Sequence, residues 1–264
     1  MTAALVTAAL LLTTAMTLAW AVERRTGGSG WIDVIWTFAV GAATLGALAL
    51  APLAQQRALL IGAAVGAWSL RLGAHLFART RKTPVDARYA ALMQSWGAQA
   101  SVRLLAFLQI QALAGFVLVS CALLAAKAPA PVWSLGAVLL TVCAFASIAG
   151  EAVADAQLAA WRRAPTVDRI CDRGLWRISR HPNYFFEWLF WAAVAALALA
   201  PPASFVSWAA LAAPAMMYWL LRYASGVPHL EAHMRRTRGQ AFEAYARRTP
   251  AFFPDPRRFF SRAS

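Results

Sequence analysis

Residues 174–187 read GLWRISRHPNYFFE and run directly into an apolar segment that ends at Pro201. Pro182 suits the first turn of a helix, because the N–H that proline lacks would have no acceptor within the helix there. Ionisable groups such as Glu187 are costly inside an apolar helix and are usually retained for a function. The stretch therefore predicts a short membrane helix whose polar start binds a ligand.

Basic side chains precede this predicted helix, and Asn183 and Glu187, four residues apart, share one of its faces. The free N–H groups of a helix N-terminus favour anions, so Arg177, Arg180 and His181 predict a phosphate-binding platform in front of it. A positively charged anchor at the membrane surface would also explain the two arginines. It would not explain Glu187 within the apolar run.

The composition is typical of an integral membrane protein. The chain of 264 residues is 61% hydrophobic and 14% charged, with mean hydropathy +0.54, which argues against a soluble globular domain. We predict an all-α protein with seven transmembrane helices, because seven apolar windows are long enough to span a bilayer. They are Thr2–Val22, Trp31–Leu53, Ala58–Ala78, Val102–Ala126, Pro131–Gly150, Tyr184–Ala200 and Ala203–Tyr223.

Lys and Arg are concentrated in alternate connections between these windows. The connections at 23–30, 79–103 and 151–183 and the tail from Ala224 hold 2, 5, 6 and 8 of them. The other three connections together hold only two, at positions 57 and 127. By the positive-inside rule, the N-terminus is outside and the C-terminus is cytoplasmic. Basic loops that face anionic lipids and ligands explain the net charge of +14, and their spread over four connections argues against nucleic acid as a partner.

Polar residues also lie inside the predicted N-terminal helices. Asp33 and Trp36 lie near the start of the second window, and Arg71 and His75 share a face of the third. Asp33 could be a solvated acid at a helix start, and Arg71 could extend its guanidinium to the membrane surface. An ion pair between Asp33 and Arg71 is the other interpretation.

A second polar group follows the fifth window. Glu151 and Asp155 are four residues apart, and Arg162 and Arg163 follow two turns later. Carboxylates accept hydrogen bonds from sugar hydroxyls, and a guanidinium matches the geometry of a phosphate. These residues therefore predict a nucleotide site, although a solvated cytoplasmic extension of the helix would also explain Glu151.

The tail adds two further candidates. The stretch from Ser225 to Glu231 is expected to end the last membrane helix and to lead into a short helix around Arg235–Arg247. Glu231 and Tyr245 can supply hydrogen bonds that close over a bound nucleotide. The histidines and cysteines show no spacing typical of a metal site, so none is expected.

The organisation is that of one membrane domain, residues 1–264. Residues 1–126 form the first four predicted helices, which are poor in polar residues and suggest a hydrophobic cavity for a lipid-like ligand. Residues 131–264 form the last three helices, the loops and the tail, where most polar groups lie and where a polar cofactor is expected.

Several of these blocks resemble the membrane steroid 5α-reductase superfamily, and in particular its bacterial members, which were formerly grouped only as a domain of unknown function. The resemblance covers the C-terminal half, and in the N-terminal half it rests on WID at 31–33 and WSLRL at 68–72. Isoprenylcysteine and phospholipid methyltransferases share a related R-H-P-x-Y block and tail. The C-terminal blocks are E-x-x-x-D-x-Q at 151–157, SRHPNYxxE at 179–187, SGVP at 225–228 and the tail from Tyr245 to Pro254.

The resemblance implies a seven-helix enzyme that binds NADPH with its C-terminal helices and cytoplasmic loops. It also implies a lipid-like enone among the first four helices, where Asp33, Trp36 and Trp68 are the expected substrate contacts. A bacterial inner membrane is the expected location, with the cofactor side facing the cytoplasm. On the family's pattern the cofactor positions are Asp155, Arg162, Asn183 and Glu187, with Glu151 beside them.

The expected reaction is that of a 3-oxo-5α-steroid 4-dehydrogenase: reduction of the C=C bond of a 3-oxo-Δ4 steroid or similar enone. Hydride adds to the β-carbon, and a hydrogen-bond donor to the carbonyl oxygen lowers the barrier. The family uses a Glu and a Tyr from its early helices, whereas no tyrosine occurs in the first four windows here. We therefore expect a protonated Asp33 to donate, with His75 or Arg71 replacing or assisting it.

Two other functions explain part of the pattern. A methyltransferase would bind S-adenosylmethionine, which has no phosphate and would leave Arg162, Arg177 and Arg180 without an anionic partner. A non-enzymatic lipid-binding or transport protein would explain the apolar helices and basic loops, but it gives no reason for the Asn183/Glu187 pair. The reductase, acting as a monomer on a membrane lipid, is the favoured prediction.

Overall fold

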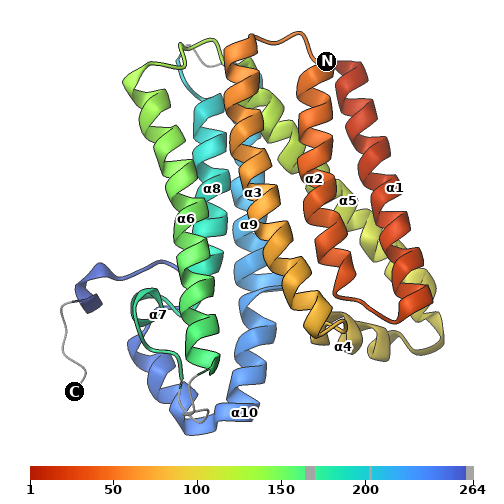
Figure 1. Ribbon diagram of the computed structural model, residues 1–264, viewed down its shortest axis with the longest axis vertical. Coiled ribbons are helices and arrows are strands. Elements are labelled where there is room, and N and C mark those ends of the chain that lie inside the picture. Colours follow the sequence, from red (N-terminus) through yellow and green to blue (C-terminus); the bar gives the residue numbers. More distant parts are fainter. Residues whose placement is uncertain (164–169, 202–203, 260–264) are drawn as a thin grey trace. The chain divides into compact units, whose positions relative to one another are not determined.

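The computed structural model describes residues 1–163, 170–201 and 204–259, and these ranges contain helices and connections without a strand (Figure 1). Contacts divide the chain into two compact units. The first unit comprises Met1–Val142 and Ala192–Ala213, and the second comprises Cys143–Trp191 and Pro214–Ser264. The boundary passes through helix α6 (Leu135–Arg163) and helix α8 (Pro182–Ala198). The expected division near residues 126–131 therefore differs from the one that the contacts draw.

The first unit is built on four long helices that lie side by side (Figure 1). Helix α2 packs against the other three, and α1 also packs against α5. A short helix, α4, and a 3₁₀ turn, η1, lead from α3 into α5, and the 3₁₀ helix η2 packs on α5. The bounds are α1 Thr2–Thr26, α2 Trp31–Leu50, α3 Gln55–Lys82, α4 Ala87–Trp96, η1 Gly97–Gln99, α5 Ala100–Lys127 and η2 Phe205–Leu211.

Small residues let these helices approach closely. A Cβ on Gly41 would lie 2.3 Å from Oγ of Ser69, and one on Gly73 would lie 2.5 Å from the ring of Phe38. A helix that is apolar on all its faces suits a position where one face packs in a core and another faces lipid. Such a helix also satisfies its own backbone hydrogen bonds. The many Ala and Leu residues therefore favour these helices through interactions between residues a few positions apart.

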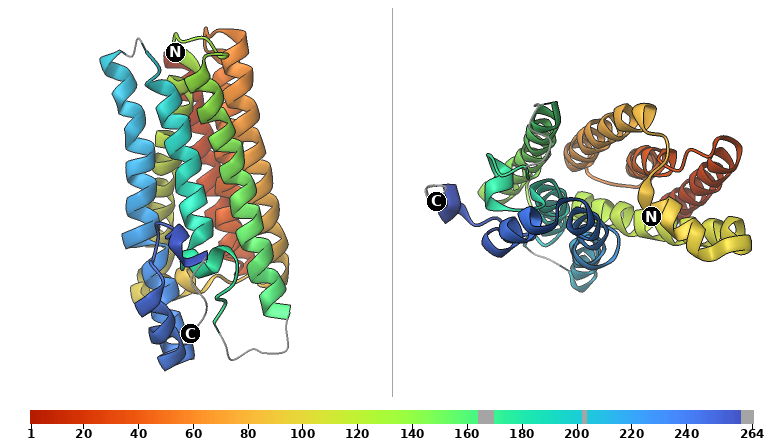
Figure 2. Two further views of the ribbon diagram at one scale, coloured as in Figure 1. Left: turned by 90° about the vertical axis from the view of Figure 1, so that its left-hand side faces the viewer. Right: turned by 90° about the horizontal axis from the view of Figure 1, so that it is seen from below.

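The second unit contains the C-terminal part of α6, the first part of α8 and the helices that follow Pro214 (Figure 2). Its C-terminal helix α10 begins earlier than the expected Arg235–Arg247, because Pro228 lies in its first turn, where proline is tolerated. Gly239, with φ of 48°, kinks that helix. The bounds are α7 Leu175–Ile178, α9 Ala212–Trp219, the π-helix η3 Leu220–Ala224, α10 Val227–Arg248 and the 3₁₀ helix η4 Pro256–Phe259.

Within the part of the chain that the structure describes, five helical segments are long and apolar enough to cross a membrane. They agree with the first five predicted spans. Of the other two, α8 has only 17 residues, and the window expected at 203–223 is divided among η2, α9 and η3. Residue 203, where that window begins, lies outside the described ranges. The five segments are Thr2–Thr26, Trp31–Leu50, Gln55–Lys82, Ala87–Lys127 and Leu135–Arg163.

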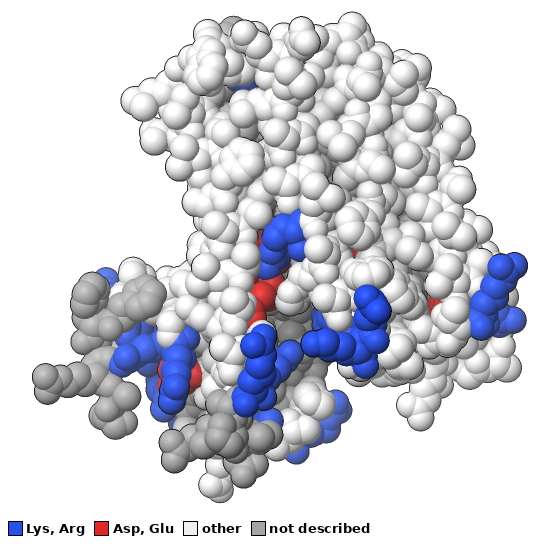
Figure 3. All heavy atoms as spheres, viewed as in Figure 1, with Lys and Arg blue, Asp and Glu red and all other residues white. Residues whose placement is uncertain are grey.

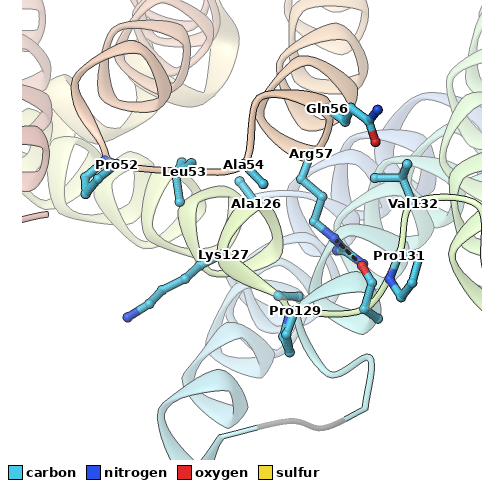
Figure 4. A pocket seen from close by; sticks show the side chains of 12 residues that line it. Pro52, Leu53, Ala54, Gln56, Arg57, Ala126, Lys127, Pro129, Pro131 and Val132 are labelled. Carbon is cyan, nitrogen blue, oxygen red and sulfur yellow. Dashed lines mark hydrogen bonds between the residues drawn. The ribbon is translucent and has the colours of Figure 1, made fainter.

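Arg57 joins the ends of several elements of the first unit (Figure 4). Its Nε and Nη2 donate to the carbonyl oxygen of Ala130 at 3.0 and 2.8 Å, and its Nη1 donates to Ala125 at 3.0 Å and Leu197 at 3.3 Å. The last two carbonyls belong to the final turns of α5 and α8, where helix dipoles favour a cation. Arg57 and Lys127 both line a cavity of about 280 Å³, and Lys127 points away from Arg57 (Figure 4). The buried guanidinium is therefore a cap for two helix ends.

Candidate functional site

In the second unit, α6 and α8 bring their predicted polar residues together. The side-chain amide of Asn183 donates from Nδ2 to Oδ1 of Asp155 at 3.3 Å. Pro182 opens α8, which places Asn183 in its first turn, as the sequence predicts. Glu151 lies one turn before Asp155 on α6, Glu187 lies one turn after Asn183 on α8, and each is only 5% exposed. Three carboxyl groups and one amide thus lie on two adjoining helices.

The two helices approach closely at this level. A Cβ on Gly150 would lie 2.6 Å from the ring of Phe186, so only glycine allows the observed spacing. Glu187 accepts a hydrogen bond from Nε1 of Trp191 at 3.3 Å. The carboxylate of Glu187 is therefore held in a fixed direction within an apolar setting.

The expected phosphate platform has a different set of contacts. Nε of Arg180 donates to Oε1 of Glu231 at 2.7 Å, and its Nη1 donates to the carbonyls of Ala246 at 2.9 Å and Thr249 at 2.5 Å. Nε2 of His181 lies 3.3 Å from the same oxygen of Glu231. Arg180, His181 and Glu231 therefore serve as hydrogen-bond partners for one another.

Charge and burial act in opposite directions on this group. Burial by itself would raise the pKa of Glu231, but hydrogen bonds from His181 and Arg180 and their charges bring it to about 2. Burial lowers the pKa of His181, and the neighbouring carboxylate of Glu231 only partly offsets this. The cluster is thus a carboxylate held by Arg180 beside a neutral imidazole.

Tyr245 has a comparable framework contact. Its hydroxyl donates to the carbonyl oxygen of Trp176 at 2.5 Å, and the oxygen of Ser179 lies 3.4 Å away. Burial raises the pKa of Tyr245. The contacts of Arg180, His181, Glu231 and Tyr245 thus brace the segment between α7 and α8, whereas their cofactor roles stay predictions.

The other predicted basic residues lie at the ends of short connections. Arg162 and Arg163 occupy the last turn of α6, directly before residues 164–169, which the structure does not describe. Arg177 lies on α7, and the backbone N–H of Leu175 in that helix donates to Gln157 of α6 at 2.9 Å. α7 is therefore fastened to the helix that carries Asp155.

In the first unit, Asp33 lies in the first turn of α2 and is the centre of a polar network. Its Oδ1 accepts a hydrogen bond from the hydroxyl of Tyr89 at 2.8 Å, and its Oδ2 accepts one from Arg88. Nη2 of Arg79 lies 4.0 Å from the same Oδ2. The structure thus pairs Asp33 with groups of the α3–α4 region, and its expected role as a protonated donor stays untested.

Asp86 orients Arg88 toward Asp33. It caps α4 by accepting from the backbone N–H of Arg88 at 2.9 Å, and it also accepts from Nε of Arg88 at 3.0 Å. Burial alone would raise the pKa of Asp86, but the hydrogen bonds and charge of Arg88, with the charge of Arg79, bring it below its ordinary value. This end of the first unit is rich in Lys and Arg (Figure 3), which lie in the last turns of α1 and α3 at positions 24, 25, 79, 81 and 82.

Tyr89 is the residue that the sequence interpretation missed. It is 4% exposed, and its hydroxyl accepts a hydrogen bond from Nε2 of Gln111 at 2.8 Å. Trp36 donates to the backbone carbonyl of Gln111 at 2.8 Å. Tyr89 lies in the charged connection before the fourth apolar window, outside the windows in which the sequence predicts the substrate contacts. The signals were the Asp86 cap and the polar Gln111 inside an apolar window.

The remaining predicted residues of the first unit lie on α3. Trp68 is fully buried and packs edge to face with Trp36, with 6.5 Å between the ring centroids. Arg71 is half-buried, whereas His75 is exposed. Of the expected substrate contacts, Asp33 and Trp36 thus join the Tyr89 network, and Trp68 packs against Trp36. Among the described residues, no group of three His, Cys, Asp or Glu side chains could hold a metal ion.

Comparison with known proteins yields one match. A family model described as "Protein of unknown function (DUF1295)" matches residues 19–249, which include both polar clusters. No curated protein and no solved structure matches the chain.

Proposed function

This chain belongs to the DUF1295 family of proteins of unknown function, and we propose that it reduces the C=C bond of a lipid-like enone with NADPH. The observation that carries the proposal is the contact of Asn183 with Asp155, beside the buried acids Glu151 and Glu187. These are the residues at which the sequence resembles the cofactor positions of the membrane steroid 5α-reductases. The burial of Glu151 and Glu187, beside Asp155 and Asn183 on the same two helices, supports a ligand with many hydroxyl and amide groups.

The donor set fits the ribose and nicotinamide parts of NADPH. Carboxylates accept hydrogen bonds from ribose hydroxyls, and an asparagine amide both donates and accepts, as recognition of a carboxamide requires. When bound, NADPH would supply the hydride. In this proposal Asn183 and Glu187 orient the nicotinamide end, and Asp155 fixes the amide of Asn183.

The phosphate contacts need a revised assignment. Arg180 is occupied by Glu231 and by two carbonyl oxygens, so we assign the phosphates to Arg162 and Arg177, with Arg163 assisting. A guanidinium pairs well with a phosphate, which would favour NADPH over NADH. Arg180 then positions the segment that carries Asn183.

We assign the hydrogen-bond donor to Tyr89 in place of Asp33. Reduction of an enone places negative charge on its carbonyl oxygen, and a donor aimed at that oxygen stabilises the charge. The hydroxyl of Tyr89 donates its single proton to Asp33 and accepts a hydrogen bond from Gln111, so in this proposal the proton turns from Asp33 to the carbonyl oxygen when the enone binds, while Gln111 continues to hold the phenol oxygen. Asp33 is then a positioning residue. The donor belongs to the first unit and the cofactor residues to the second, so each assignment is tested by itself.

The proposal includes the membrane topology expected from the charges. α8 and the segment from η2 to η3 are the two further spans, which gives seven, with the N-terminus outside. The basic ends of α1 and α3 and the mouth of α8 then face the cytoplasm of a bacterial inner membrane, where NADPH is available. Fusions of alkaline phosphatase or of green fluorescent protein, each placed after Thr26 or after Lys127, would test this orientation.

A methyltransferase is the second candidate, and one observation favours it. Because Arg180 has a carboxylate partner within the protein, it does not require a phosphate-bearing ligand. S-adenosylmethionine could therefore bind without leaving that guanidinium unpaired.

Ligand binding by the purified full chain separates the candidates. We expect NADPH, but neither NADH nor S-adenosylmethionine, to raise the thermal unfolding temperature, and conjugated steroid or isoprenoid ketones to gain two hydrogens, as measured by mass spectrometry. Stabilisation by S-adenosylmethionine alone would refute the reductase. Binding of none of the three would favour a lipid-binding or transport protein.

A further inference from the structure

The C-terminal segment at residues 249–258, which we call the strap, is fastened to the connection between α7 and α8. Three hydrogen bonds of 2.8–2.9 Å join the two segments, two of them between backbone groups and one from the side chain of Ser179. The bonds run from the N–H of Arg180 to the oxygen of Pro250, from Oγ of Ser179 to the oxygen of Phe252, and from the N–H of Asp255 to the oxygen of Ile178. The strap is therefore part of the second unit.

The strap turns one aromatic ring inward and the next outward. Phe252 is 3% exposed and lies 5.1 Å from the ring of Tyr218 at the end of α9. Phe253 is 51% exposed, and its centroid lies 5.4 Å from that of Trp188 in α8. Figure 2 (left) shows the dark blue strap beside these helices. The outward ring thus extends an aromatic cluster at one end of two apolar helices.

The exposed surface continues along the end of α9 and η3. Trp219 and Tyr223 are 59% and 57% exposed, and Tyr223 lies 5.8 Å from Tyr218 in the cluster. The guanidinium carbon of Arg222 lies 5.1 Å from the ring centroid of Tyr223. Amphipathic aromatic rings beside a cation form this surface.

We propose that this surface, built on Trp219, Arg222, Tyr223 and Phe253, binds the anionic headgroup region of the bilayer and thereby holds the strap in place. Tyr and Trp favour the headgroup level of a membrane, where one part of the ring is apolar and another is polar. Arg side chains there attract anionic lipids. The surface lies where α8 begins and α9 ends, which is the level of the interface for two helices that enter the bilayer. The inference does not depend on the proposed reductase activity.

Lipid binding would affect the contacts of Arg180 and Glu231 through the strap. The strap begins at Thr249, whose carbonyl accepts from Arg180, and Arg180 is bound to Glu231. Displacement of the strap would remove this acceptor and the acceptor for the backbone of Arg180. Anionic lipid should therefore stabilise the start of α8.

The first experiment measures thermal unfolding of the full chain in nanodiscs of phosphatidylcholine with and without phosphatidylglycerol. We expect the anionic lipid to raise Tm by about 3 °C or more. The variant Arg222→Gln should lose most of this rise, while the matched variant Arg236→Gln, which removes an exposed arginine of α10, should keep it. An equal rise in both variants would overturn the proposal. Inorganic phosphate added to detergent-solubilised protein should not reproduce the rise, and if it does, the site binds free anions instead of a bilayer.

The second experiment measures insertion of the strap. A fluorophore is attached to Phe253→Cys or, as the control, to Gln240→Cys, each in a Cys143→Ala background because Cys121 and Cys171 are buried. Brominated lipid should quench the label at position 253 at least several-fold more than the label at position 240. Equal quenching at the two positions, or none at position 253, would show that the strap lies in water.

Discussion

The hydroxyl of Tyr89 donates a hydrogen bond to Asp33 at 2.8 Å and accepts one from Gln111 at 2.8 Å. The three residues come from α4, α2 and α5, and Trp36 fixes the backbone of Gln111. A buried phenol with one acceptor and one donor has a defined orientation. This relationship connects an acid that the sequence pattern selected with a tyrosine that it did not.

Replacement of Tyr89 by phenylalanine tests the donor assignment. The ring and its packing remain, but the proton that would stabilise the carbonyl oxygen is lost, so turnover of an enone should fall by about 10²-fold or more. NADPH binding, measured by thermal shift, should be unchanged. Ser95→Ala removes an exposed hydroxyl from the same helix and should retain full turnover. Retained turnover in Tyr89→Phe would remove Tyr89 from the mechanism.

Asn183 offers a separate test of the cofactor site. Asn183→Ala removes the amide that contacts Asp155, so we expect the Kd for NADPH to rise by about tenfold or more, as the loss of one or two hydrogen bonds to charged groups implies. Glu187→Ala should abolish turnover. Isothermal titration measures the affinity, with the exposed Gln240→Ala as the control. An unchanged Kd in Asn183→Ala would contradict the assignment.

The cluster of Arg180, His181 and Glu231 predicts a loss of stability in acid. The pKa of Glu231 is about 2 in the folded chain against an ordinary value of 4.5, so its contribution is fully present above pH 4.5 and is lost as the pH falls toward 2. His181, whose pKa lies below its ordinary 6.5, acts in the same direction, because below that value the unfolded chain binds the proton more readily.

Tm measured from pH 7.5 down to pH 3 checks this expectation. The variant Glu231→Gln should unfold at a lower temperature at pH 7.5, because it leaves the Arg180 guanidinium without its carboxylate, and its Tm should depend less on pH below 4.5. Glu243→Gln removes a carboxylate that is 46% exposed on the same helix and serves as the control. If both variants showed the wild-type pH dependence, Glu231 would not be the group responsible.

Arg57 should contribute to stability and not to ligand binding. Arg57→Lys keeps the charge, but its single ammonium group lacks the planar guanidinium that donates four hydrogen bonds to three carbonyl oxygens, so we expect a Tm lower by about 5 °C or more. The nearby exposed Lys127→Gln changes a charge without touching these carbonyls and should leave Tm unchanged. The Kd for NADPH, calculated for the folded fraction of each variant, should be the same in both variants. An unaltered Tm in Arg57→Lys would show that the cap is dispensable.

The helices were predictable to different degrees. The first five apolar windows correspond to helices with shifted ends, because long runs of Ala, Leu and Val favour the helix by themselves. The last two windows were harder. α8 is short, and the region before Tyr223 changes from a 3₁₀ helix to an α-helix and then to a π-helix. Apolar composition does not distinguish among these three forms, because it is the same in each.

The amino-acid sequence alone determined that the protein is helical and apolar, where its basic connections lie, and that Asn183 and Glu187 share one helix face. Those properties depend on neighbours a few residues apart. Only the tertiary structure decided which partners the charged groups have. Arg180 meets Glu231 across 51 positions, and Asp33 meets Tyr89 across 56. Such contacts depend on helix packing, since a buried charge is stabilised by whichever opposite charge or hydrogen-bonding group the fold brings near.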